Sequence, residues 1–134
     1  MVQRLEAWSP QLLGLLRIVA GSLFLSHGVV KLFGLPAGAM PGQQPLLSLL
    51  GLGGCIEIVT GALISIGLFT RPAAFFASGQ MAVAYWMFHA PKAPLPVENG
   101  GDAAILYCFV FLCFVGVGPG KFSIDRIMRS PQDL

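Results

Sequence analysis

The chain has 134 residues, of which 55% are hydrophobic and only 10% are charged, and its net charge is +2. Soluble domains carry about 25% charged residues, and a soluble chain of this length cannot bury so much apolar surface in one core. The composition therefore excludes an ordinary soluble domain and predicts an integral membrane protein. The Lys and Arg residues are scattered rather than clustered, so nucleic acid is not an expected partner.

The first predicted membrane span covers residues 12–33 and carries three ionisable residues, Arg17, His27 and Lys31. Its length suffices to cross a bilayer, but ionisable groups at membrane depth are unfavourable. At about 100° per residue, Arg17 and Lys31 fall on one helical stripe, with His27 at its edge. This stripe must face other helices or water. A secretory signal has a shorter apolar region that follows its basic residues, so the segment is interpreted as a retained helix.

Three further spans are predicted after Pro/Gly-rich or polar connections, over residues 46–69, 72–90 and 102–117. Pro72 suits the first position of the third helix. Asn99 and Asp102 suit a cap for the fourth helix, and Ser123 suits a cap for a short helix in the polar tail. Short connections favour antiparallel neighbours, so the expected fold is all-α: a single domain, residues 1–134, formed by an antiparallel up-down bundle of four transmembrane helices.

Small residues at helical spacing let the spans approach closely. They are Gly14, Gly21, Gly28, Gly54, Gly61, Ala73, Ala77 and Ala84.

Basic residues in short loops and ends predict the orientation, because they favour the cytoplasmic side. One side of the four-span layout carries Arg4, Arg71, Lys121, Arg126 and Arg129, whereas Lys92 lies on the other side. Both termini are therefore expected in the cytoplasm.

Glu57 is the only ionisable residue of the second span. Helical rise places it between Arg17 and His27 in depth. One hypothesis is a structural ion pair between Arg17 and Glu57 that fixes the helix register. The other is a redox or proton-linked pocket formed by His27, Lys31 and Glu57, since intramembrane ionisable residues often mark functional sites. The sequence leaves both open.

Three polar residues complete the candidate site. Gln80 is expected to form a hydrogen bond across helices. His89 suits the membrane interface, although together with His27 it could ligate a metal or haem. Asn99 either helps to cap the fourth helix or forms a lid that contacts His27 or Lys31. The three cysteines lie in apolar runs without a CxxC pair, which favours small buried hydrophobes over disulfides or metal ligands.

The sequence contains several motifs in an order and spacing typical of one family. They are RIVAG (17–21), SHGVVKLFG (26–34), the central Glu57, GLFTRPAA (67–74), MAVA (81–84), ENGGD (98–102) and GPGKFSID (118–125). With these motifs the chain resembles the DoxX family of small four-helix proteins of the bacterial inner (plasma) membrane. Asp102 stands where Glu is more common. Relatives in that family include a membrane subunit of thiosulfate:quinone oxidoreductase and a member of a membrane-associated oxidoreductase complex.

The resemblance implies a multi-pass membrane subunit associated with redox metabolism, which binds a quinone or a similar lipophilic molecule in an outward-facing polar pocket. In this hypothesis His27 bonds a carbonyl or passes a proton, Lys31 orients the head group, and Glu57 accepts a proton. The expected partners are membrane lipid, redox proteins and further copies of the chain. No flavin, nucleotide or dithiol motif indicates an autonomous enzyme. The alternative is a non-enzymatic scaffold, assembly chaperone or small transporter whose buried charges only hold the helices together.

Overall fold

The computed structural model describes residues 6–129. Within these residues the regular structure is entirely helical, so the prediction of an all-helical chain is confirmed for them. The elements are α2 (Ser9–Phe33), α3 (Leu49–Ile66), α4 (Thr70–Ala84), the π-helical segment η1 (Tyr85–His89), α5 (Pro96–Asn99), α6 (Asp102–Val117) and α7 (Ile124–Met128). The basic residue Arg4, used above for orientation, lies outside the described residues.

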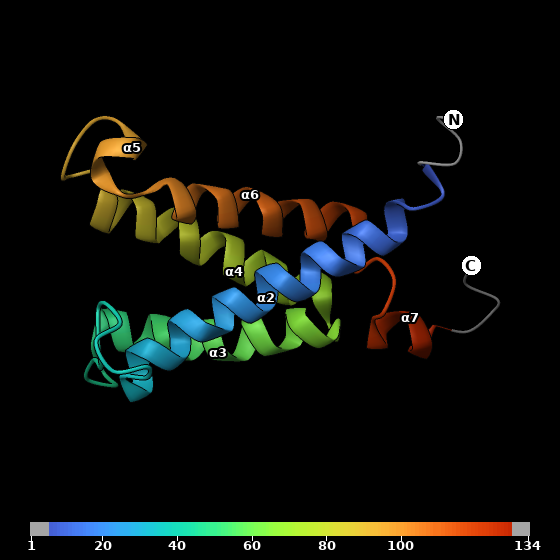
Figure 1. Ribbon diagram of the computed structural model, residues 1–134, viewed down its shortest axis with the longest axis horizontal. Coiled ribbons are helices and arrows are strands. Elements are labelled where there is room, and N and C mark those ends of the chain that lie inside the picture. Colours follow the sequence, from blue (N-terminus) through green and yellow to red (C-terminus); the bar gives the residue numbers. More distant parts are fainter. Residues whose placement is uncertain (1–5, 130–134) are drawn as a thin grey trace.

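The four long helices run antiparallel and associate mainly as two pairs (Figure 1). Helix α2 packs along α3, and α4 packs along α6, while α3 and α4 contact each other across the tight turn that joins them. In Figure 1 the two pairs converge on the right, at that turn and near α7. They diverge towards the left, where α5 and the loop after α2 lie.

Glycines allow the close approach of α2 and α3, as predicted. A Cβ atom on Gly28 would lie 2.7 Å from the carbonyl oxygen of Gly54, and one on Gly61 would lie 2.7 Å from the backbone nitrogen of Leu25. Real Cβ atoms do not come so close to backbone, so larger residues here would force α2 and α3 apart.

Small and aromatic residues form the interface between α4 and α6. Ala73 and Ala77 of α4 are buried, as are Phe111 and Phe114 of α6. Phe24 reaches this core from α2, with its ring centroid 4.9 Å from that of Phe111 in an edge-to-face contact. Ile64 of α3 belongs to the same core, which therefore joins all four long helices.

The helix boundaries differ from the predicted spans at the turn between α3 and α4. The prediction that Pro72 takes the first helical position is wrong, because α4 already begins at Thr70. Asp125 makes this possible: its carboxylate accepts hydrogen bonds from the backbone N–H groups of Phe69 and Thr70, at 2.8 and 2.9 Å. Burial by itself raises the pKa of Asp125, but these backbone hydrogen bonds outweigh it and hold the pKa below its usual value.

The short helix α7, which carries Asp125, begins as the sequence predicts. The side-chain oxygen of Ser123 accepts a hydrogen bond from the backbone N–H of Arg126 at 3.3 Å. The segment before it crosses α2, and a Cβ atom on Gly14 would lie 2.3 Å from the carbonyl oxygen of Lys121. Gly14 therefore makes room for this segment rather than for another long helix.

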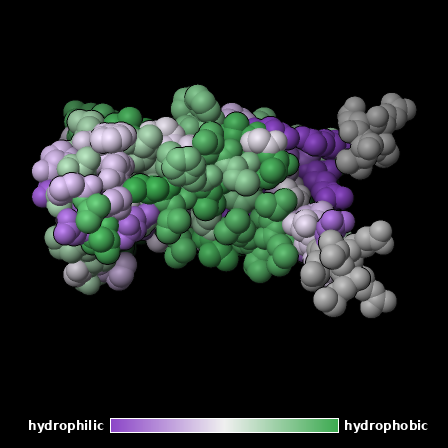
Figure 2. Space-filling view, turned by 90° about the horizontal axis from the view of Figure 1, so that it is seen from above, coloured by the Kyte–Doolittle hydropathy of each residue, from purple (hydrophilic) through white to green (hydrophobic). Residues whose placement is uncertain are grey.

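Large hydrophobic side chains cover much of the outer surface. Figure 2 shows a hydrophobic band across the middle of one face, with more hydrophilic residues towards both ends. In the described part of the chain α2 and α3 are long and apolar enough to cross a membrane. An exposed apolar surface of this extent is typical of contact with lipid. It includes Leu15, Val19 and Leu23 of α2, Val59 of α3, Phe75, Phe76 and Val83 of α4, and Leu106 and Phe109 of α6.

Candidate functional site

A cavity of about 1210 Å³ lies at the diverging end of the two helix pairs. Ligand pockets in proteins commonly enclose about 300–1,000 Å³ and are mostly apolar with a few placed polar groups. Most of the lining here is apolar. The polar side chains around it are His27 and Lys31 from α2, Glu57 and Thr60 from α3, Gln80 from α4, His89 from η1 and Lys92 from the loop that follows, and the aromatic ones include Phe24 and Tyr107 from α2 and α6.

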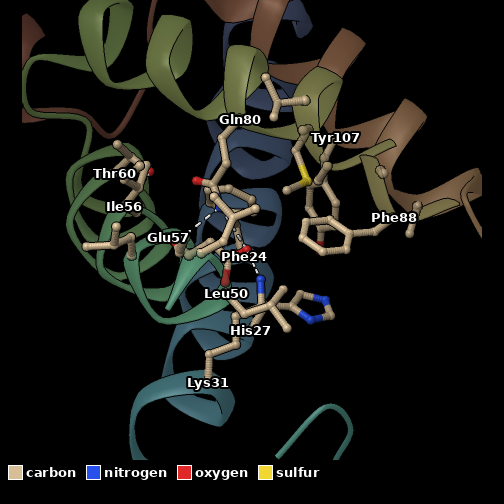
Figure 3. A pocket seen from close by; sticks show the side chains of 18 of the residues that line it. Phe24, His27, Lys31, Leu50, Ile56, Glu57, Thr60, Gln80, Phe88 and Tyr107 are labelled. Atoms are coloured by element: carbon tan, nitrogen blue, oxygen red, sulfur yellow. Dashed lines mark hydrogen bonds and ion pairs between the residues drawn. The ribbon is translucent and has the colours of Figure 1, made fainter. Parts of the chain in front are cut away.

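The centre of the site is an ion pair between Lys31 and Glu57. Glu57 is only 1% exposed, so its carboxylate is held inside the protein. The side-chain amide of Gln80 donates to Glu57 Oε1 and to the carbonyl oxygen of Gly53, both at 3.1 Å. Figure 3 shows these side chains converging from α2, α3 and α4. The predicted hydrogen bond of Gln80 across helices is therefore confirmed.

The glycines of α3 explain why Lys31 reaches Glu57. Gly54 lies one turn before Glu57, and a Cβ atom on Gly54 would meet the Cβ of Lys31 at 2.9 Å. The missing side chain thus lets α2 bring Lys31 against α3 beside the carboxylate. At the neighbouring Gly53, the exposed carbonyl oxygen accepts the second hydrogen bond of Gln80.

Two acceptor oxygens of this cluster remain unused. Glu57 Oε2 and Gln80 Oε1 are buried and have no hydrogen-bond partner among residues 6–129. Buried polar groups are nearly always paired, and an unpaired one lowers stability by about 1–3 kcal/mol. The cluster therefore joins α2, α3 and α4, but two of its acceptor oxygens have no hydrogen-bond donor within the described residues.

The predicted ion pair between Arg17 and Glu57 is wrong. Arg17 is fully buried, and its guanidinium lies at the converging end of the helices, away from the cavity lining. All its hydrogen bonds go to backbone carbonyl oxygens, at 2.6–3.3 Å. The acceptors are Ile64 and Ser65 at the end of α3, and Pro119, Lys121 and Phe122 in the segment before α7.

The physical reason is that the last carbonyl groups of a helix have no partner within it. A guanidinium has five N–H donors, and it satisfies such carbonyls while its charge favours the negative end of the helix dipole. The long side chain of Arg17 extends towards the end of α3 rather than towards Glu57. Lys31 is left as the partner of the carboxylate.

His27 lies at the exposed edge of the cavity. Its ring contacts Tyr107 edge-to-face, with centroids 6.1 Å apart. Tyr107 also stacks on Phe111, with centroids 5.6 Å apart. Sequence reasoning missed Tyr107, although a single hydroxyl-bearing residue in the apolar run of the fourth span was a usable signal.

His89 and Asn99 organise the outer loop. His89 Nδ1 lies 3.1 Å from the carbonyl oxygen of Asn99. The Asn99 side chain donates to the carbonyl oxygen of Ala93 at 2.9 Å and accepts from the N–H of Gly101 at 2.8 Å. The prediction of a side-chain cap on α6 is wrong, because Gly101 occupies that position. The hydrogen bonds of Asn99 stay within this loop, so it does not join Lys31.

The residues suggested for metal binding do not form a cluster. His27 and His89 both line the cavity, but across residues 6–129 no three His, Cys, Asp or Glu side chains gather closely enough to hold an ion. His89 instead bonds the loop backbone.

Comparisons with known proteins give a consistent picture. The DoxX family profile matches residues 12–90. An uncharacterized protein of Haemophilus influenzae is 41% identical over 132 residues, which cover 93% of this chain and 96% of that protein. An uncharacterized membrane protein of Mycobacterium tuberculosis is 30% identical over 140 residues, covering 91% and 84% of the two chains. No solved structure matches the chain.

Proposed function

The chain belongs to the DoxX family, and from this premise we propose that it is a multi-pass inner-membrane protein that binds a small lipophilic molecule, such as a quinone, in its cavity. One observation carries the proposal. A large, mostly apolar cavity is lined by a polar cluster of the buried Glu57 and the partly buried Lys31 and Gln80, in which two acceptors are unused among the described residues. This arrangement suits a molecule with an apolar body and one polar end.

We propose that all four long helices cross the membrane. At 1.5 Å per residue, α2 is about 37 Å long, α3 about 27 Å, α4 with η1 about 30 Å and α6 about 24 Å, against a hydrocarbon core of about 30 Å. Three basic residues gather at one end of the molecule: Arg71 in the first turn of α4, Lys121 in the segment before α7 and Arg126 within α7. By the positive-inside rule this end is cytoplasmic, and the cavity then opens towards the outer side.

The lining also indicates a route for the ligand. Leu52 and Ile56 of α3 and Phe75 and Phe76 of α4 line the cavity and are exposed on the surface. In a bilayer these side chains meet lipid, so a lipophilic molecule would enter sideways from the membrane. Its body would lie between α3 and α4, with its head group at Glu57.

Each polar residue has a role in this proposal. Lys31, already paired with Glu57, keeps further N–H donors for a head group. His27, at the exposed edge, would bond a second polar group of the ligand or pass a proton outward. These groups bind and orient but carry no electrons. We therefore propose that the protein serves redox metabolism as a membrane subunit beside a redox partner protein, in lipid, alone or with further copies of the chain.

Ligand retention tests the proposal. The full chain, purified in mild detergent, should release a lipophilic molecule into organic extracts, and a short-chain quinone, in its oxidised or its reduced form, should raise its Tm in a saturable manner. His27→Ala and Lys31→Met should weaken this response. Cys113→Ser, on an exposed residue of α6 outside the lining, should leave it unchanged. An empty protein whose Tm responds to neither form would contradict the proposal.

A second candidate is a non-enzymatic scaffold, chaperone or small transporter, and one observation favours it. The same polar groups join helices: Lys31 links α2 to Glu57, and Gln80 links α4 to α3. If this is their whole role, replacing Lys31 or Glu57 alone should impair folding, and a double variant in which the two residues are exchanged should restore folding and function together. Capture of partner proteins should then depend on the exposed loops rather than on His27.

A further inference from the structure

We propose that the head group bound at Glu57 and Gln80 carries a hydroxyl donor, as in a phenol, a hydroquinone or a lipid alcohol, and that a head group with carbonyl oxygens alone binds poorly. This inference rests on the proposed function, because it assigns the chemistry of the ligand in the same cavity.

The hydrogen bonds of Gln80 fix which of its atoms is free. Its Nε2 donates to two acceptors, the Gly53 carbonyl and Glu57 Oε1. The opposite orientation would place an oxygen against both of these oxygens. The atom without a partner is therefore Oε1, which can only accept.

The carboxylate of Glu57 likewise has one oxygen with hydrogen-bond donors and one without. Oε1 receives two donors, from Lys31 and from Gln80, whereas Oε2 receives none from the described residues. A carboxylate in an ion pair has acceptors only. Two acceptor oxygens without a donor, Glu57 Oε2 and Gln80 Oε1, are therefore buried in the wall of the cavity, on adjacent helices.

Nearby protein hydroxyl groups do not satisfy these oxygens. Thr60 lines the cavity, but its hydroxyl donates to the carbonyl oxygen of Ile56 at 2.6 Å. Tyr107 also lines the cavity, and no hydrogen bond joins it to Glu57 or Gln80 within residues 6–129. The missing donor is thus left for a ligand to supply.

A hydroxyl group complements this site better than a carbonyl group. It can donate to Glu57 Oε2 or Gln80 Oε1 and at the same time accept from a remaining N–H of Lys31. A carbonyl oxygen can accept from Lys31 but leaves both acceptors unpaired. In hydrocarbon surroundings unpaired polar groups are especially unfavourable, and sites built around hydrogen bonds reject analogues that lack the matching hydroxyl.

The test uses three probes with the same alkyl chain: decyl hydroquinone, decyl benzoquinone and the dimethyl ether of the hydroquinone. Each is titrated into the full-length wild-type protein in lipid nanodiscs, with oxygen excluded for the hydroquinone, and Kd is measured by calorimetry. The hydroquinone should bind at least about tenfold more tightly than either other probe, as expected for one hydrogen bond to a charged group. Because this comparison uses wild type, it does not depend on the folding of any variant.

Variants then assign the preference to the two oxygens. Glu57→Gln and Gln80→Met should each reduce the hydroquinone preference to about threefold or less, while Cys113→Ser should retain it in full. Equal binding of the three probes, or tighter binding of the quinone, would overturn the inference and leave the proposed function in place. Absence of saturable binding by all three would overturn the proposed function as well. An undiminished preference in both variants would also refute the assignment.

Discussion

Replacing Arg17 by Met should destabilise the protein more than any other single change at the end near α7. Arg17 is fully buried and bonds five carbonyl oxygens from two segments that are 47 to 105 residues away in the chain. Methionine fills a similar volume but donates no hydrogen bond. The end of α3 and the segment before α7 would both lose their link to α2.

The magnitude follows from the number and kind of these bonds. Each hydrogen bond from a charged donor stabilises by about 1.5–3 kcal/mol, so five would sum to roughly 7–15 kcal/mol, as much as the whole stability of a typical domain. The carbonyls of Ile64 and Ser65 lie at a helix end, where local rearrangement and water restore part of the lost hydrogen bonding. We therefore expect a loss of about 3–5 kcal/mol, the range seen when a buried polar network is broken, and a Tm lower by roughly 10 °C or more.

The partly buried thiols of Cys55 and Cys108 allow the measurement, because a thiol-reactive fluorophore reports their exposure on heating. Arg71→Met is the matched control. Arg71 is exposed, and among residues 6–129 its side chain bonds only the carbonyl oxygens of Val115 and Gly116, so a loss of about 1 kcal/mol or less is expected. Arg17→Met with a Tm within about 2 °C of wild type would refute this account.

Three further predictions concern the remaining contacts and use the same unfolding assay. Lys31→Met and Glu57→Gln should each lower the free energy of unfolding by about 2–4 kcal/mol. The double variant should lose at least about 1 kcal/mol less than the sum of the two single losses, because one change removes the partner of the other. Additive losses would contradict the ion pair. Gly28→Ala places a Cβ atom 2.7 Å from a carbonyl oxygen of α3 and should cost about 2 kcal/mol, whereas Gly116→Ala, with open space around it, should be neutral. Burial raises the pKa of Asp125, but backbone hydrogen bonds lower it by more, so the folded-state pKa lies below the usual value. The ionised side chain therefore stabilises the fold fully above its unfolded pKa of about 3.9. This stabilisation is lost as the pH falls through the lower folded value. Asp125→Asn should therefore be less stable than wild type above about pH 5, and the difference should disappear at pH values well below 4; a difference that grows on acidification would contradict the sign.

Hydropathy alone predicted the helices well, since each long apolar run became one. Boundaries that depend on local chemistry were also accessible: Ser123 caps α7 as expected. The start of α4 could not be predicted in this way, because Asp125, 55 residues away, supplies the acceptor that lets the helix begin at Thr70. Contacts at such sequence separation leave no periodic pattern, so the local signal at Pro72 was misleading.

Sequence reasoning identified the ionisable residues of the cavity but not their pairing, and their role as site residues stays a prediction. An ionisable residue within an apolar run must find a partner, and Lys31 and Glu57 do pair with one another at the cavity. Depth along the helix was a poor guide to the partner of Glu57, because it ignored backbone acceptors. The five carbonyls that bind Arg17 are invisible in a sequence, since every residue has one and only the fold leaves these five unpaired.

The two ends of the molecule treat their charged side chains differently, and this contrast supports a ligand at one of them. At the end near α7, Arg17, Arg71 and Asp125 each bond backbone groups that a helix end leaves unpaired. These three charged side chains thus have partners, although the hydroxyl oxygen of Thr70 at the same end is buried and unpaired within residues 6–129. At the other end, a carboxylate oxygen of Glu57 stays unpaired within the described residues, beside a cavity that is large and mostly apolar. If Glu57 served only to join helices, a leucine pair would do so without leaving an unused acceptor. The unused acceptor of Glu57 therefore supports the proposal that a ligand supplies the donor.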